Sequence, residues 1–222
     1  MERIIKVTGK GKISVKPDLI RLLINLEDKR ETYEETVEQS TLQLEMLRDC
    51  FAKLGFERAD LKTINFNVNT EYESYQDENR AWKQKFIGYK FVHAMKLEFD
   101  ADNKRLGEVL YALAHAPVCP EFRINYTIKD VEAAKNKLLG KAVADSKEKA
   151  CALTEAAGVK LGDIVTIDYS WGDKEFVSEP MVRNLAAPMM RSAKADSYNI
   201  DIEPDDISVT DTVTVVWEIR CP

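Results

Sequence analysis

Residues 64–72 read Ile-Asn-Phe-Asn-Val-Asn-Thr-Glu-Tyr, and this stretch is the clearest strand pattern in the chain. Successive side chains of a strand point to opposite faces of its sheet. The alternation therefore predicts one buried face and one face of asparagines in water. The predicted buried face carries Ile64, Phe66, Val68, Thr70 and Tyr72.

A second long strand follows a polar connection, residues 74–85. Its apolar side chains again occupy every second position, which predicts a single buried face. This face comprises Tyr89, Phe91, His93, Met95, Leu97 and Phe99. Together the two strands predict a long antiparallel hairpin with a loose tip.

The opening segment, residues 4–27, is also strand-like, and its second half alternates regularly. Glycines at positions 9 and 11 and the Pro17-Asp18 pair interrupt its first half. Because glycine and proline weaken a strand interior, these interruptions predict bulges or a bend rather than one flat strand.

Three segments are predicted helices: residues 32–54, 103–114 and 131–157. Gly55 and Gly158 follow the two long helices and predict their C-terminal ends. The apolar stripe of the first helix comprises Val37, Leu44, Leu47, Phe51 and Leu54. The stripe of the last helix comprises Val131, Ala134, Leu138, Ala142, Leu153 and Ala157.

Further alternation predicts strands at residues 122–128, 163–169 and 207–219. The element order then contains a weak repeat of strand, long helix, glycine stop and two strands. This order predicts an α+β fold with two similar strand-helix-hairpin units, whose antiparallel sheets are covered by two long helices. We expect one domain over residues 1–222, with subunits of roughly 1–100 and 101–222.

Residues 171–206 show little periodicity and contain three prolines. Such long unpatterned stretches are uncommon inside compact domains. Two interpretations are open: a mobile surface connection, or an arm that packs on a neighbouring subunit. Its methionines, Met181, Met189 and Met190, fit adaptable packing against a partner better than soft-metal binding.

The composition excludes several classes of partner. The net charge is −6, which repels a phosphate backbone or an anionic membrane surface. No stretch approaches the apolar run of a spanning helix. The first residues carry charges and lack a signal core, so we expect a cytoplasmic location for the chain as written. A periplasmic location is the alternative, if a signal has been removed.

The sequence predicts no catalytic, cofactor-binding or metal-binding residues. His93 lies on an apolar strand face and is interpreted as a packed core residue, and His115 as a cap at a helix end. Asp18 fits a turn or cap, and the acidic cluster around Asp205-Asp206 a solvated turn. The four cysteines form no C-x-x-C pair and predict reduced thiols packed as small hydrophobes.

Two glycine motifs also fail as ligand-binding loops. Gly9-Lys10-Gly11 is too short for a phosphate loop and lacks its terminal Lys-Ser/Thr. The stretch 158–162 has two glycines like half of a dinucleotide fingerprint, but it follows a helix and precedes a strand. Pyrophosphate binding requires the reverse order.

Several stretches together resemble the SIMPL-domain (YggE-like) family, which includes periplasmic immunogenic proteins. They are residues 7–11, 15–18, the Gly88-Tyr89 pair, residues 142–145, 149–150, 156–162, 202–204 and 213–215. The resemblance spans nearly the whole chain. It implies an α+β fold and frequent export, and at least one member is a ring-like, channel-shaped homo-oligomer. Roles implied include oxidative-stress tolerance and, in animals, a signalling adaptor; no catalytic residues carry over.

The sequence is compatible with three functions. The first is a non-enzymatic assembly protein whose copies associate through sheet edges and the 171–206 arm, because long exposed strand edges are normally protected. The alternative is an adaptor or ligand-binding module that holds a ligand between its two layers, with aromatic contacts from Tyr75 and Trp82 at the hairpin tip. The third is an unrecognised enzyme, which requires a convergent cluster of titratable groups.

Overall fold

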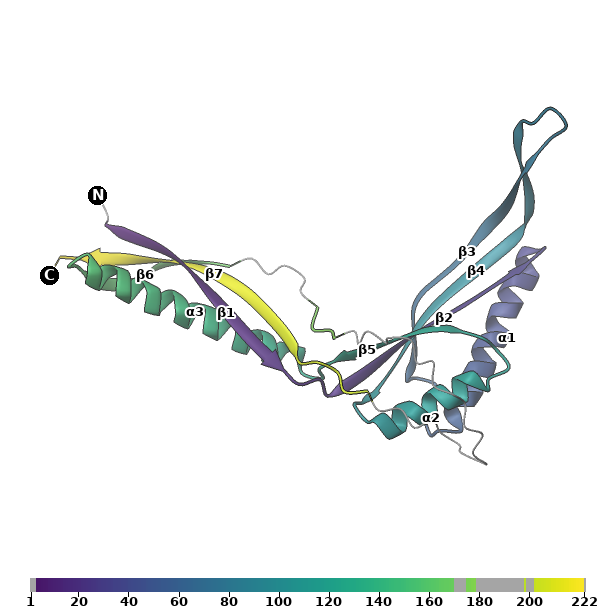
Figure 1. The fold of residues 1–222 in the computed structure, drawn as a ribbon, viewed down its shortest axis with the longest axis horizontal. Helices are drawn as coiled ribbons and strands as arrows, with labels where there is room; N and C mark the ends of the chain where they lie inside the picture. The colour runs from purple at the N-terminus through teal and green to yellow at the C-terminus, as the bar shows by residue number, and fades with distance from the viewer. Residues whose placement is uncertain (1–2, 170–174, 179–197, 199–201, 222) are drawn as a thin grey trace. The chain divides into compact units, whose positions relative to one another are not determined.

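The computed structural model describes residues 3–169, 175–178, 198 and 202–221 (Figure 1). Its fold is α+β, with two antiparallel sheets, as the sequence predicts. The elements are β1 (Ile4–Val15), β2 (Leu19–Arg30), α1 (Tyr33–Ala52), β3 (Leu61–Gln76), β4 (Trp82–Asp100), α2 (Asn103–Ala114), β5 (Glu121–Thr127), α3 (Val131–Ala156), β6 (Lys160–Asp168) and β7 (Ile207–Arg220).

The chain folds into two compact units, and each unit is built from more than one stretch of the chain. Unit 1 comprises residues 1–18, 127–178 and 205–222, and unit 2 comprises residues 19–126 and 179–204. The units do not follow the predicted division near residue 100. The reason is that β1 pairs with β7, from Ile4 opposite Glu218 to Val15 opposite Ile207, and so draws both ends of the chain into unit 1.

Unit 2 is a four-stranded sheet in the order β3-β4-β2-β5. Alternate residues of β2 and β4 are buried against α1 and α2 on one face, whereas the residues between them are only partly buried. Burial of large apolar side chains supplies most of the stabilisation of such a layer. The fully buried members include Ile20, Leu22, Ile24, Leu26, Leu47, Phe91, Met95, Leu97, Leu106 and Val109.

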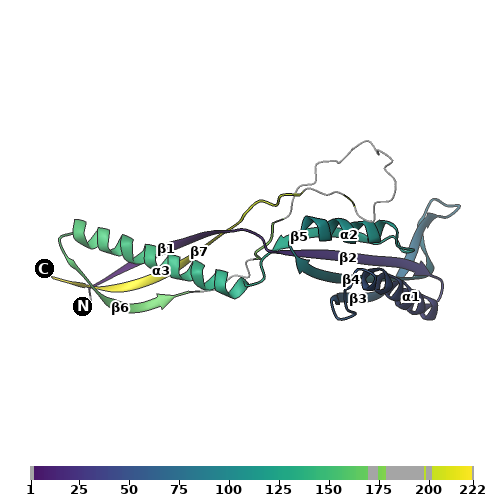
Figure 2. The same cartoon turned by 90° about the horizontal axis from the view of Figure 1, so that it is seen from below.

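Unit 1 is a three-stranded sheet in the order β1-β7-β6, with α3 lying along β1 and β7 (Figure 2). Here α3 approaches β1 very closely: a Cβ on Gly9 would lie 2.0 Å from the Ala142 carbonyl oxygen. The glycines therefore serve close packing. Of the predicted bulges or bend, the bulges are wrong, because β1 pairs with β7 in unbroken register, whereas residues 16–18 do interrupt the segment between β1 and β2. The buried stripe of α3 comprises Ala134, Leu138, Ala142, Ser146, Ala150 and Thr154. The predicted stripe member Leu153 is 54% exposed.

The predicted repeat is present in the element order. It consists of β2-α1-β3-β4 and β5-α3-β6-β7, and each long helix ends at a glycine with positive φ, Gly55 or Gly158. In both, the next residue donates its backbone N–H to the carbonyl five residues back, as in a Schellman motif. The two repeats differ in the strand that precedes the helix. Strand β2 lies in the same sheet as β3 and β4, whereas β5 lies in the sheet of unit 2 and β1 takes its place beside β7 in unit 1.

Strand β3 departs from the predicted alternation at a bulge. Thr63 lies opposite Met95 and Asn65 lies opposite Ala94, so Ile64 is an extra residue in the register. The extra residue places Ile64 on the other face from Phe66 and Val68. The predicted single buried face is therefore wrong. Because β3 is an edge strand, Ile64, Phe66 and Tyr72 are all exposed.

The hairpin tip is shorter and better defined than the predicted connection of residues 74–85. The strands pair as far as Gln76 opposite Trp82, which leaves only residues 77–81 as the turn. The Asp77 carboxylate accepts the backbone N–H groups of Asn79 (2.9 Å) and Ala81 (3.0 Å). This local hydrogen bonding replaces the predicted loose tip with a tight turn.

Candidate functional site

His93 is packed in the core of unit 2, as the sequence predicts. Its side chain is 6% exposed, and Nε2 lies 2.8 Å from Thr63 Oγ1. A hydroxyl beside an imidazole resembles a nucleophile and its base, but such a pair needs a third group that orients the ring. Among the described residues Nδ1 has no hydrogen-bond partner. Burial, with a smaller contribution from the Arg48 charge, lowers the pKa of His93.

The other predicted cap and turn residues also have local partners. His115 is the C-cap of α2, where its Nδ1 lies 2.9 Å from the Tyr111 carbonyl oxygen and its ring stacks on Tyr111. Asp18 accepts the Lys129 backbone N–H at 2.8 Å. Asp206 accepts the Ser14 hydroxyl at 3.1 Å, just before β7. These contacts assign local structural roles to all three side chains.

Other predicted residues are dispersed or lie outside the description. Met181, Met189, Met190 and Asp201 are outside the described residues. Within the part of the chain that the structure describes, no three His, Cys, Asp or Glu side chains gather closely enough to hold a metal ion. All four cysteines are free thiols, but only Cys50 is partly buried. Packing as small hydrophobes is thus wrong for Cys119, Cys151 and Cys221.

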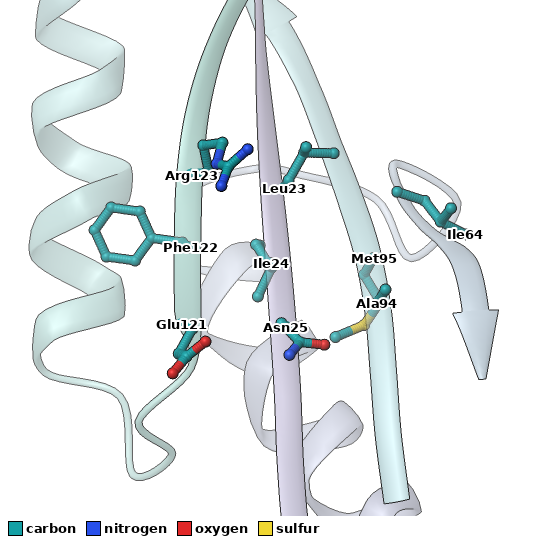
Figure 3. Close-up of a pocket in the computed structure, with 9 residues that line it drawn as sticks. All are labelled: Leu23, Ile24, Asn25, Ile64, Ala94, Met95, Glu121, Phe122 and Arg123. Atoms are coloured by element: carbon teal, nitrogen blue, oxygen red, sulfur yellow. The ribbon is translucent and has the colours of Figure 1, made fainter. Parts of the chain in front are cut away.

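A shallow depression of about 310 Å³ opens on the sheet face of unit 2 that α1 and α2 leave uncovered (Figure 3). Leu23 and Ala94 line it, together with the bulge residue Ile64. Glu121 and Arg123 of β5 add one charge of each sign, and the Arg123 side chain extends toward Leu23 (Figure 3). The lining residues offer a surface for a small molecule, but they place no nucleophile beside a base.

The outer edge of β1 is closed by side chains from α3. Asp145 Oδ2 accepts the Lys10 backbone N–H at 2.6 Å. Lys141 donates to the Lys12 carbonyl (3.2 Å), and Lys149 donates to the Thr8 carbonyl (3.4 Å). Lys149 also pairs with Asp145 at 2.6 Å, and this hydrogen bonding lowers the pKa of Asp145. We call this set of contacts the β1 seal, because it occupies edge groups that could otherwise pair with another strand.

The outer edge of β3 has no comparable seal among the described residues. From residue 63 to residue 70 the strand reads Thr-Ile-Asn-Phe-Asn-Val-Asn-Thr, without a charge or a proline. Charges and prolines are the usual protection of an edge strand. Phe66 is 42% exposed on this edge. Strand β6 is also an edge and carries exposed Ile164, Val165 and Ile167.

Beyond the end of β2, the β3–β4 hairpin carries a group of exposed aromatic rings. Trp82 is 72% exposed, and Tyr72, Tyr75 and Phe86 are also exposed. The Tyr72 and Phe86 rings meet edge to face with centroids 5.8 Å apart. Only Tyr75 and Trp82 were predicted to make contacts, because the polar residues 74–85 are typical of a loop, whereas in the structure most of them are paired strands.

These features define a two-sheet α+β protein whose most distinctive surfaces are strand edges and an aromatic hairpin. No helix among the described residues is long and apolar enough to span a membrane. The SIMPL family model, described as a protein of unknown function (DUF541), matches residues 5–217, and the chain belongs to this family. The resemblance stated from sequence motifs is therefore confirmed.

Curated relatives agree with this assignment. The 26 kDa periplasmic immunogenic protein of Brucella melitensis biotype 1 is 26% identical over 218 residues, which cover 97% of this chain and 84% of the relative. The protein of the same name from Brucella abortus matches with the same identity and coverage. Both names place the relatives in the periplasm, and neither states an activity.

Proposed function

We propose that this protein is a non-enzymatic envelope protein that assembles with copies of itself through the β3 edge. The observation that carries the proposal is the contrast between two long edges. Side chains of α3 close β1, whereas residues 63–70 of β3 present an uncharged edge with exposed apolar side chains. The unpaired backbone groups of an unprotected edge strand are a ready template for pairing with another strand.

An antiparallel pairing of two β3 strands about a two-fold axis fits the sequence of this edge. With Asn67 on the axis, Phe66 of one copy would lie opposite Val68 of the other, and Asn65 opposite Asn69. Aromatic and β-branched residues make favourable cross-strand pairs. A two-fold interface uses the same surface in both copies, so one strand supplies both halves.

A periplasmic location is proposed from the relatives, whose printed names are periplasmic. It replaces cytoplasm as the preferred location. The proposal needs no catalytic group, and the described residues that the sequence singled out have structural partners instead. A role in stress tolerance and a contribution of residues 171–206 to assembly stay predictions.

Charge at position 67 tests the pairing. Like charges directly opposite one another destabilise a strand pair, and opposite charges do not. Light scattering after size exclusion should therefore give a multiple of 25.3 kDa for the native protein and a lower mass for Asn67→Lys and for Asn67→Asp. Mixing the two variants should restore association between copies.

Asn136→Lys is the matched control, because Asn136 is also exposed but lies on α3. It should keep the native mass. A native protein that stays at 25.3 kDa at high concentration would contradict the proposal. So would Asn67 variants that associate as the native protein does.

A further inference from the structure

The β3–β4 hairpin continues beyond the sheet that carries it. The last pair of β2 with β4 is Arg30 opposite Tyr89, whereas β3 and β4 stay paired as far as Gln76 opposite Trp82. This two-stranded extension is visible in Figure 1 above the end of α1. Isolated two-stranded ribbons are marginally stable, so this extension depends on the sheet that carries it.

The two faces of the extension differ in charge. One face, which we call the aromatic face, carries three cross-strand pairs without any charge. These pairs are Tyr72 with Phe86, Ser74 with Gln84, and Gln76 with Trp82. The opposite face carries Glu71, Glu73, Tyr75, Lys83 and Lys85. Both faces are in water, so the segregation does not reflect burial in this chain.

The aromatic face has rings at its two ends and polar groups between them. Phe86 lies edge to face against both Tyr72 (5.8 Å) and Tyr89 (5.2 Å), which restricts its motion. Trp82 stands four residues away, about 13 Å along a strand at roughly 3.3 Å per residue. The Ser74 and Gln84 pair lies between the Tyr72–Phe86 and Gln76–Trp82 pairs in the register, on the same face of the hairpin.

We propose that the aromatic face binds a neutral polysaccharide chain. A pyranose ring presents C–H groups on its faces, which stack on an aromatic ring, and hydroxyls at its rim. Amide and hydroxyl side chains both donate and accept hydrogen bonds, as those hydroxyls require. Two aromatic platforms about 13 Å apart exceed the span of one sugar ring, so the fit is to a chain rather than a monosaccharide.

The charge pattern selects among polymers. The aromatic face offers no cation for a phosphate or carboxylate, and the chain's net charge of −6 adds long-range repulsion. An apolar peptide would need a pocket for its anchoring side chains. The depression of about 310 Å³ is lined by residues 23–25, 64, 94–95 and 121–123, none of which belongs to the extension. The neutral glycan is therefore the favoured occupant.

Affinity electrophoresis tests the proposal with hydroxyethyl cellulose, a neutral β-glucan, in a native gel. The full chain should be retarded, with retardation increasing with glucan concentration. Trp82→Ala and Phe86→Ala should each weaken binding about tenfold or more. Tyr75→Ala is the matched control, because Tyr75 is exposed on the opposite face of the same extension, and it should bind as the native protein does.

Retardation by the anionic glycan alginate that equals or exceeds that by the neutral glucan would overturn the proposal. So would loss of binding in Tyr75→Ala equal to that in Trp82→Ala, or the absence of retardation by the glucan. Gln84→Ala, which keeps both rings, should weaken binding with no change in unfolding midpoint. The proposal does not depend on self-assembly. The affinity of each Asn67→Lys chain for the glucan should therefore equal that of a native chain.

Discussion

At the scale of single residues, Gly9 shows how closely the layers of unit 1 approach. A Cβ at this position would lie 2.0 Å from the Ala142 carbonyl oxygen and 2.5 Å from the Ser146 backbone nitrogen. Backbone atoms of a long helix cannot move aside independently, so the helix would have to shift as a whole. Gly9 and Gly11 therefore allow α3 to pack closely on β1, a role that the interruption of a strand pattern does not predict.

Gly9→Ala should destabilise the protein by about 1–3 kcal/mol, the usual cost of overpacking. Gly140→Ala is the matched control on α3, the helix that packs against Gly9, because an added Cβ at Gly140 meets nothing within 4 Å. It should stabilise the protein by up to about 1 kcal/mol, because alanine is the better helix former. Urea unfolding midpoints of the two variants should thus move in opposite directions, and equal midpoints would contradict the packing account.

His93 predicts how stability depends on pH. Burial lowers its pKa in the folded state, so the unfolded chain binds a proton more readily below the ordinary value of 6.5. The contribution of neutral His93 to the stability of the fold is fully present above pH 6.5. It is lost as the pH falls through that value toward the lower pKa of His93 in the folded state. Arg48 is the charge that disfavours protonation, and Glu45, whose pKa is lowered to about 2 mainly by Arg58, stays ionised throughout.

His93→Gln should consequently lose less stability than the native protein between pH 7.5 and pH 5. Urea unfolding of the native protein and of His93→Gln at the two pH values measures this difference. An equal loss in native protein and His93→Gln would assign the pH dependence to other groups.

At the scale of elements, the β1 seal makes a local prediction. Asp145→Ala removes the charged acceptor of the Lys10 N–H, so that amide should exchange with solvent faster. Asp145→Asn keeps an uncharged acceptor, so the exchange rate of the Lys10 amide in this variant should lie between the rates in the native protein and in Asp145→Ala. Glu148→Ala, an exposed carboxylate further along α3, should leave the Lys10 amide unchanged. Hydrogen exchange followed at Lys10 distinguishes these outcomes, and unchanged exchange in Asp145→Ala would show that the seal protects nothing.

The elements also show what the sequence could predict. The helix ends near Gly55 and Gly158 and the approximate positions of the strands followed from local chemistry, and they are confirmed. The Ile64 bulge was missed because one extra residue leaves no mark in the alternation itself. Leu153 was misassigned because α3 buries small residues against glycines, so apolar size does not identify its inner face.

At the scale of the whole molecule, the repeat in the order of elements was predictable, but the sheet that each of β1 and β5 joins was not. Pairing of β1 with β7 joins residues separated by most of the chain, and no local pattern encodes such a contact. The surfaces of interest were predicted only in outline. Exposed edges and Trp82 were anticipated, whereas the charge difference between the hairpin faces required the register of β3 with β4.

Amide hydrogen exchange along β3 as a function of protein concentration tests self-assembly most directly. Edge amides that point away from β4 exchange rapidly in a single copy and become protected when another strand pairs with them. Residues 65–69 should gain protection as the native protein is concentrated, and Asn67→Lys should abolish that gain. Rapid exchange of these edge amides at every concentration would contradict assembly through β3.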